Sequence, residues 1–135
     1  MAGEKPSETG EEPINREHLS RMRAAVGEAT LRRYALGYLN LLPERLDRIG
    51  QAIGADNAAE AERVIVDLQI SSEMLGARQL AAKLTALKLS LRTGLVSITA
   101  QLAGVRTEAA LVTATIRAAT GLDDLGRPDH AAPAD

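Results

Sequence analysis

Apolar residues recur at steps of three and four through most of this 135-residue chain. From Leu31 to Ile53 the pattern is unbroken, and it returns over residues 80–91 and 98–119. Such spacing places the apolar side chains on one face of an α-helix, whereas a half-buried strand requires strict alternation. The chain is therefore predicted to be all-α, an antiparallel helical bundle in which these faces pack together.

The composition also favours helices over sheets. Phe and Trp are absent, and Tyr34 and Tyr38 are the only aromatic residues, one helical turn apart and expected at the edge of the core. The core must then be built from Ala, Leu, Val and Ile, a set poor in the aromatic residues that stabilise sheets. An all-β sandwich is excluded on these grounds.

Glycines divide the apolar pattern into a four-helix core and a short N-terminal helix. The predicted helices span residues 16–26, 28–53, 57–74, 78–92 and 98–119, and the dividing residues are Gly27, Gly54, Gly76 and Gly94. The bundle domain covers residues 15–121. The segments 1–14 and 122–135 are polar, contain Pro and Gly, and are predicted to be a disordered lead and a disordered tail.

Three local features bear on these boundaries. Pro43 removes a backbone donor inside the second helix and is expected to kink or interrupt it. Asp56 is predicted to cap the third helix, because its carboxylate can accept the free N–H groups of the first turn. Leu91 and Ile98 keep the same phase across Gly94, so the last two helices could also form one long helix.

Several classes of function lack the residues that they need. There is no Cys, and His18 and His130 lie in the polar ends, where they are predicted to be exposed bystanders. No paired carboxylates, phosphate-binding glycine loop or metal cluster stand out, so neither an enzyme nor a cofactor is expected. A net charge of −2 gives no case for nucleic-acid binding. No apolar run reaches the length of a membrane span and no leader is evident, so a cytoplasmic location is predicted.

The third predicted helix carries more apolar residues than one buried face requires. Its inward stripe consists of Ala61, Ile65, Leu68, Ser72 and Leu75. Val66 and Ile70 fall outside that stripe, and the polar residues around them are Arg63, Gln69 and Glu73. Either another helix covers Val66 and Ile70, or the two are exposed and form a docking surface for a protein partner.

The small and apolar residues of this helix continue in register into the next one. They are Leu68, Ser71, Ser72, Leu75, Gly76 and Ala77, followed by Leu80, Ala81, Leu84, Arg92 and Gly94. This spacing resembles the signature of histidine phosphotransfer (Hpt) domains, Ala-His-x-Leu-Lys-Gly-Ser-Ala-x-x-Leu-Gly-Ala and then a leucine-patterned helix ending in Arg-x-Gly. Pro43 and Asp56 also fit, so the likeness spans about residues 16–120. Hpt domains are small helical bundles that relay phosphate between histidine kinases and receiver domains, and the resemblance implies an Hpt-like fold.

The chain departs from that signature at the positions that carry the Hpt chemistry. Val66 stands at the position of the phosphoacceptor histidine, Gln69 at that of the lysine and Ile70 at that of the glycine. A valine has no lone pair with which to accept a phosphoryl group. The resemblance therefore implies a pseudo-phosphotransfer domain. Asp67 and Ser71 are nucleophile types without a paired base, and the Ser71 hydroxyl is predicted to bond to the preceding turn.

Arginines gather on the second helix and around the third. They are Arg32, Arg33, Arg45, Arg48, Arg63 and Arg78. These residues form either a solvated helix face or a secondary docking face, made by Arg45, Arg48 and Arg78, that meets an acidic surface. The resemblance supplies a candidate for that surface, because receiver domains are acidic around their phosphoacceptor aspartate.

Two functions from different classes remain open. The leading hypothesis is a non-catalytic, Hpt-like regulator of bacterial two-component signalling. It docks on the receiver domain of a response regulator, or on the dimerisation bundle of a histidine kinase, through Arg63, Val66, Gln69, Ile70 and Glu73. The alternative is a self-associating helical scaffold, a homodimer whose seam is the seven-residue repeat from Ile98 to Ala119.

Overall fold

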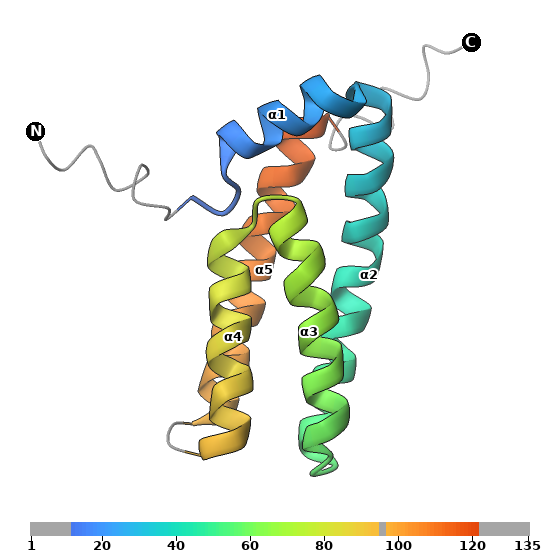
Figure 1. The fold of residues 1–135 in the computed structure, drawn as a ribbon. Coiled ribbons are helices and arrows are strands. Elements are labelled where there is room, and N and C mark those ends of the chain that lie inside the picture. The colour runs from blue at the N-terminus through green and yellow to red at the C-terminus, as the bar shows by residue number, and fades with distance from the viewer. Residues whose placement is uncertain (1–11, 95–96, 122–135) are drawn as a thin grey trace, which may run out of the picture.

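The computed structural model describes residues 12–94 and 97–121. Within these ranges the chain forms the helices α1 (Arg16–Val26), α2 (Glu28–Gly54), α3 (Ala58–Met74), α4 (Arg78–Thr93) and α5 (Ile98–Thr120), and no strand. Helices α2 to α5 run alternately up and down the bundle, and α1 lies across one end of it (Figure 1). The predicted all-α antiparallel bundle with a short N-terminal helix is confirmed.

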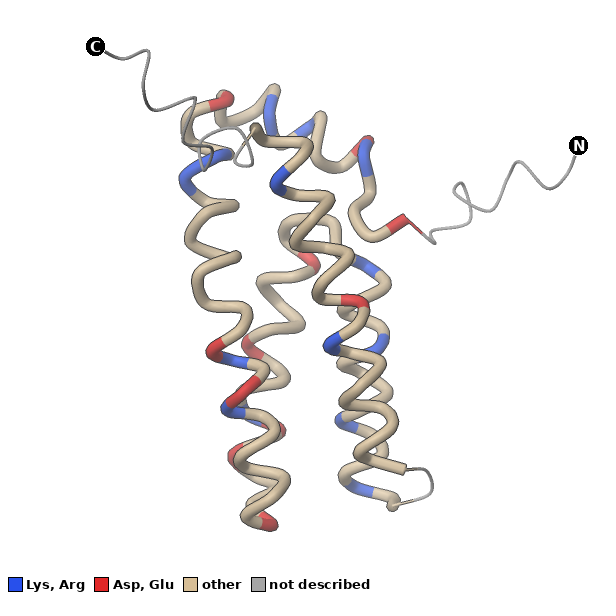
Figure 2. Tube along the Cα trace, turned by 180° about the vertical axis from the view of Figure 1, so that it is seen from behind, with Lys and Arg blue, Asp and Glu red and all other residues tan. Residues whose placement is uncertain are grey.

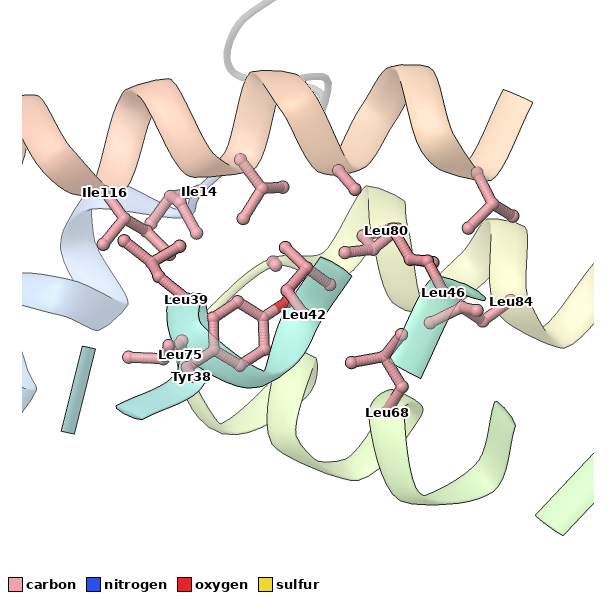
Figure 3. Close-up of a cluster of buried hydrophobic side chains, with 14 of the residues drawn as sticks. Ile14, Tyr38, Leu39, Leu42, Leu46, Leu68, Leu75, Leu80, Leu84 and Ile116 are labelled. Atoms are coloured by element: carbon pink, nitrogen blue, oxygen red, sulfur yellow. The ribbon is translucent and has the colours of Figure 1, made fainter. Parts of the chain in front are cut away.

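The core is built from the predicted apolar stripes. Leu, Ile, Val and Ala side chains from α2, α3, α4 and α5 meet along the bundle axis, and Tyr38 is the one aromatic residue among the buried apolar side chains (Figure 3). The seven-residue repeat of α5 takes part in this core, since Val105, Val112 and Ile116 are fully buried. The central residues of the predicted dimer seam are therefore used inside the monomer, whereas Ile98 and Leu102 are partly buried and Ala119 is exposed.

The start of α1 is fixed to the turn between α3 and α4. The Asn15 amide donates to the Gly76 carbonyl at 2.8 Å, and His18 Nε2 donates to the Met74 carbonyl at 2.8 Å. Gly76 has a φ of +86°, and a Cβ there would lie 3.0 Å from His18 Cδ2. The prediction that His18 is an exposed bystander is wrong, because its partly buried ring ties α1 to the bundle.

Ile14 also corrects a predicted boundary. The sequence predicts that Ile14 belongs to the disordered lead, yet its side chain is 1% exposed and belongs to the core. The hydrogen bond of the neighbouring Asn15 to Gly76 brings the chain onto the bundle at this point. Ordered structure thus begins before residue 15, while residues 1–11 and 122–135 lie outside the described residues.

Helix α2 remains continuous through Pro43, from Glu28 to Gly54. The buried side chains of Leu39, Leu42 and Leu46 hold the helix on both sides of the proline, which itself lies on the exposed face. Of the two effects predicted for Pro43, a kink or an interruption, the interruption does not occur. In contrast, Gly94 adopts a left-handed φ of +66° and ends α4, so α4 and α5 are separate helices.

The cap of α3 is Asn57 and not Asp56. The Asn57 side chain accepts a hydrogen bond from the Glu60 amide at 3.2 Å, whereas Asp56 has a left-handed φ of +59° in the preceding turn. Asp and Asn can both cap a helix, and the geometry of the turn places Asn57 at the cap position.

Replacing Asn57 with alanine is expected to lower the free energy of unfolding by about 1 kcal/mol, because the Glu60 amide loses its acceptor. Replacing Asp56 with glycine is expected to raise it by up to about 1 kcal/mol, because glycine adopts a positive φ without strain. Urea denaturation followed by circular dichroism measures both changes. An Asn57→Ala variant as stable as the parent would contradict the assignment of the cap.

Candidate functional site

An open groove lies between α2 and α3, with a volume of about 850 Å³. Its lining residues are Thr30, Arg33, Tyr34, Gly37, Tyr38, Leu41 and Arg45 from α2, and Asp67, Leu68, Ile70, Ser71 and Met74 from α3. Three of its apolar side chains are strongly exposed: Ile70 is 55%, Met74 is 52% and Leu41 is 45% accessible. The groove therefore presents apolar surface that no residue of the described part of the chain covers.

Helical spacing explains why the lining residues of each helix lie together on one wall of the groove. On α2 the lining positions recur every three or four residues, two of them as adjacent pairs, and Asp67, Ile70 and Met74 follow the same spacing on α3. Gly37 lies in the middle of the α2 wall, and a Cβ added there would meet nothing within 4 Å. The missing side chain at Gly37 leaves open space at this point of the groove.

Two tyrosines connect the walls of the groove. The hydroxyls of Tyr38 and Ser72, both buried, lie 2.7 Å apart in a hydrogen bond between α2 and α3. Burial raises the pKa of Tyr38 to about 12, although its hydrogen bond with Ser72 acts in the opposite direction. The Tyr34 hydroxyl donates to the Met74 sulfur at 3.3 Å. Side-chain hydrogen bonds thus join the two walls of the groove.

Two of the six predicted arginines, Arg45 and Arg63, pair with nearby carboxylates. Arg63 donates to both carboxylate oxygens of Glu60, at 2.8 and 3.1 Å, and these hydrogen bonds lower the pKa of Glu60. Arg45 and Arg63 both lie within ion-pair distance of Asp67, at 3.9 and 3.7 Å. Exposed pairs of this kind contribute little to stability, but they reduce the net positive charge at the surface.

Of the arginines in the predicted secondary docking face, two are brought together and one is not. Arg45 and Arg48 line a smaller cleft of about 160 Å³ beside the groove, together with Arg63 and Asp67. Acidic and basic residues alternate along this half of α2 (Figure 2). Arg78, the first residue of α4, is exposed but lines neither the groove nor this cleft.

The predicted docking residues of α3 point in different directions. Ile70 lines the groove, whereas the side chain of Gln69 donates to the Thr85 hydroxyl of α4. Val66 is partly buried and lies on the side of α3 between Glu62 and Gln69, both of which bond to α4. Glu73 is exposed. Val66 and Ile70 therefore do not form one exposed pair, and Ile70 is the one that faces the groove.

Sequence reasoning placed Arg45 in a docking face but missed the apolar part of the α2 wall. Leu41 lies outside the inward stripe of α2 in the same way that Ile70 lies outside that of α3, so its position was a usable signal. Met74, Gly37 and Tyr34 gave no comparable signal. Their role depends on how α2 and α3 pack against each other, which periodicity does not specify.

Ser71 and Asp67, the two side chains at the groove that could act as nucleophiles, are both engaged in structural contacts. The Ser71 hydroxyl donates to the carbonyls of Asp67 and Leu68, at 3.2 and 3.3 Å, as predicted. Asp67 itself faces the two arginines described above. Across residues 12–94 and 97–121, no group of three or more His, Cys, Asp or Glu side chains is arranged to hold a metal ion. The geometry offers a shaped apolar surface for binding.

Comparisons of the chain with protein-family models, with curated proteins and with solved structures find no match. In the described part of the chain, no helix combines the length and the apolar character needed to cross a membrane. A function must therefore be argued from the fold and from the groove.

Proposed function

We propose that this chain is a non-catalytic, Hpt-like signalling protein that docks through the α2–α3 groove on the receiver domain of a response regulator. The observation that carries the proposal is the groove itself. It opens beside α3, the helix with the Hpt-like spacing, and it exposes Leu41, Ile70 and Met74 together. Contiguous exposed apolar surface of this kind is typical of protein interaction sites.

Docking without phosphate transfer fits the residues on α3. Val66 cannot accept a phosphoryl group. Gln69 carries no positive charge, and its side-chain amide is hydrogen-bonded to the Thr85 hydroxyl. The chain would then occupy a receiver surface and regulate or compete with true phosphotransfer proteins. A cytoplasmic location belongs to the same proposal, since two-component phosphorelays operate there.

Electrostatics favour an acidic partner at one end of the groove. Arg33 lines the groove and has no ion pair with any described residue, while Arg45 and Arg48 lie at the other end beside acidic residues. Charged rims of this kind raise association rates and make them sensitive to salt. The acidic surface around the phosphoacceptor aspartate of a receiver is complementary to Arg33.

The test compares Ile70→Asp with Leu111→Asp, a matched change of an exposed apolar residue on α5, outside the groove. Ile70→Asp is expected to weaken binding to the partner receiver by about 30-fold or more, because a charge is buried at the centre of the interface. Leu111→Asp is expected to leave binding unchanged. Calorimetric titration with purified receiver domains and kinase dimerisation bundles from the source organism measures the affinities.

The outcomes separate the candidate functions. If the chain binds a kinase bundle and no receiver, the proposed partner is wrong but the groove remains the docking site. An equal loss of affinity in Ile70→Asp and Leu111→Asp would contradict the assignment of the groove as the docking site. The fold favours a self-associating scaffold less, because the central members of the α5 repeat, Val105, Val112 and Ile116, are buried in the monomer. Concentration-dependent dimers in sedimentation experiments, disrupted by Leu111→Asp alone, would revive that alternative.

A further inference from the structure

We propose that the α2–α3 groove binds a free anionic amphiphile, a single-chain carboxylate such as dodecanoate, with its alkyl chain along the groove and its head group at Arg33. The volume of about 850 Å³ lies within the range of roughly 300–1,000 Å³ that is usual for small-molecule sites. The walls are apolar and the polar lining groups are few, which is the usual character of such sites.

Gly37 gives the groove depth where an alkyl chain would pass. It lies in the interior of the long helix α2, where glycine is less favourable than alanine by roughly 0.5–1 kcal/mol. No turn or positive φ requires it, and a side chain added there would enter open space. The structure therefore shows room for a ligand atom next to the α2 backbone at this position.

The charges at the two ends of the groove differ. At the end near Leu41, Arg45 lies 3.9 Å from Asp67, so the opposite charges offset each other. At the other end Arg33 has no ion pair with any described residue, and Arg32 and Arg33 are the only charged residues between Ala29 and Pro43. An anionic head group is complementary to Arg33 and not to the Arg45 end.

Hydroxyl donors accompany Arg33 at its end of the groove. Thr30 and Tyr34 lie one turn from each other and both line it. The Tyr34 hydroxyl donates to a thioether sulfur, which is a weak acceptor and which a carboxylate oxygen can replace. Twelve residues separate Arg33 from Arg45, about 18 Å along the helix axis, so one head group and one extended tail fill the groove lengthwise.

The experiment titrates the full chain with dodecanoate below its micelle concentration, by calorimetry and by amide chemical shifts. Dodecyltrimethylammonium, with the same tail and the opposite charge, is expected to bind at least about tenfold more weakly. Arg33→Gln is expected to weaken dodecanoate binding about tenfold, and Arg117→Gln on α5 to leave it unchanged. Gly37→Leu fills the groove and is expected to weaken binding at least about tenfold, the equivalent of two buried methylene groups.

Gly104→Leu is the control for Gly37→Leu. Gly104 is also inside a helix, α5, and a Cβ there also meets nothing within 4 Å, but it does not line the groove. The proposal is overturned if dodecanoate does not bind, if both amphiphiles bind equally, or if the two leucine variants behave alike. Retention on phosphatidylglycerol vesicles without binding of free dodecanoate would also overturn it, since the ligand would then be a membrane surface.

This inference is tested without any partner protein, so it fails or stands independently of the docking proposal. One consequence rests on the proposed function. A bound amphiphile would occupy the surface around Ile70 and Met74 and exclude a docked receiver.

Discussion

The free energy of unfolding is expected to fall by about 3 kcal/mol in total, because of Tyr38 alone, as the pH rises from well below 10 to well above 12. In the folded chain, burial raises the pKa of Tyr38 from 10.0 to about 12. The unfolded chain releases the phenolic proton near the ordinary value, while the folded chain retains it. The contribution of protonated Tyr38 to the free energy of unfolding is therefore fully present below pH 10, declines between the two pKa values, and is lost above pH 12.

Urea denaturation at a series of pH values measures this decline, with Tyr38→Phe as the reference chain. The difference between parent and variant isolates Tyr38 from lysines and from Tyr34, which both chains share. Tyr38→Phe also leaves the buried Ser72 hydroxyl without its partner and is expected to cost about 1–2 kcal/mol at neutral pH. Adding Ser72→Ala should recover part of that loss. An equally steep decline in Tyr38→Phe would assign the pH dependence to other groups.

Most of the fold could be predicted because each helix carries its own local signals. The three-and-four spacing marks the buried faces, and glycines with positive φ stand at Gly27, Gly76 and Gly94. Errors arose where tertiary contacts outweigh local preference. Packing of Leu42 and Leu46 keeps α2 helical through Pro43. The contacts of α1 with the α3–α4 turn likewise order residues that look like part of a polar lead.

The sequence indicated only part of the groove. An apolar residue outside the buried stripe identified Ile70, and the same reasoning applied to α2 would have found Leu41. Which of these residues share a groove depends on the relative rotation of α2 and α3. The same rotation decides that Ile70 lines the groove while Val66, one turn earlier on α3, does not. Helical periodicity assigns residues to faces but does not pair the faces of different helices.

Restoring the chemical groups of the Hpt signature is expected to turn the chain into a phosphoacceptor. In a Val66→His, Gln69→Lys variant, an imidazole nitrogen replaces a side chain without a lone pair, and an ammonium group offsets the added negative charge. Val66 is partly exposed, so the longer histidine side chain can reach the surface of α3. Ile70 is kept because it supplies the proposed docking contact. The loss of the Gln69 hydrogen bond to Thr85 should cost about 1 kcal/mol, which a folded domain tolerates.

The variant is incubated with the phosphorylated receiver domain that the parent chain binds. The P–O bond of the aspartyl phosphate breaks, the aspartate leaves as a carboxylate, and an N–P bond forms on the imidazole, which gives up a proton. Intact-mass spectrometry is expected to show the phosphorylated variant, and no phosphorylated product for the parent or for a Val66→Ala, Gln69→Lys control. A variant that binds the receiver but takes no phosphoryl group would mean that position 66 does not face the aspartate. The docking proposal would survive that result, because it depends on Ile70 and the groove, whereas the alignment of Val66 with the Hpt histidine would not.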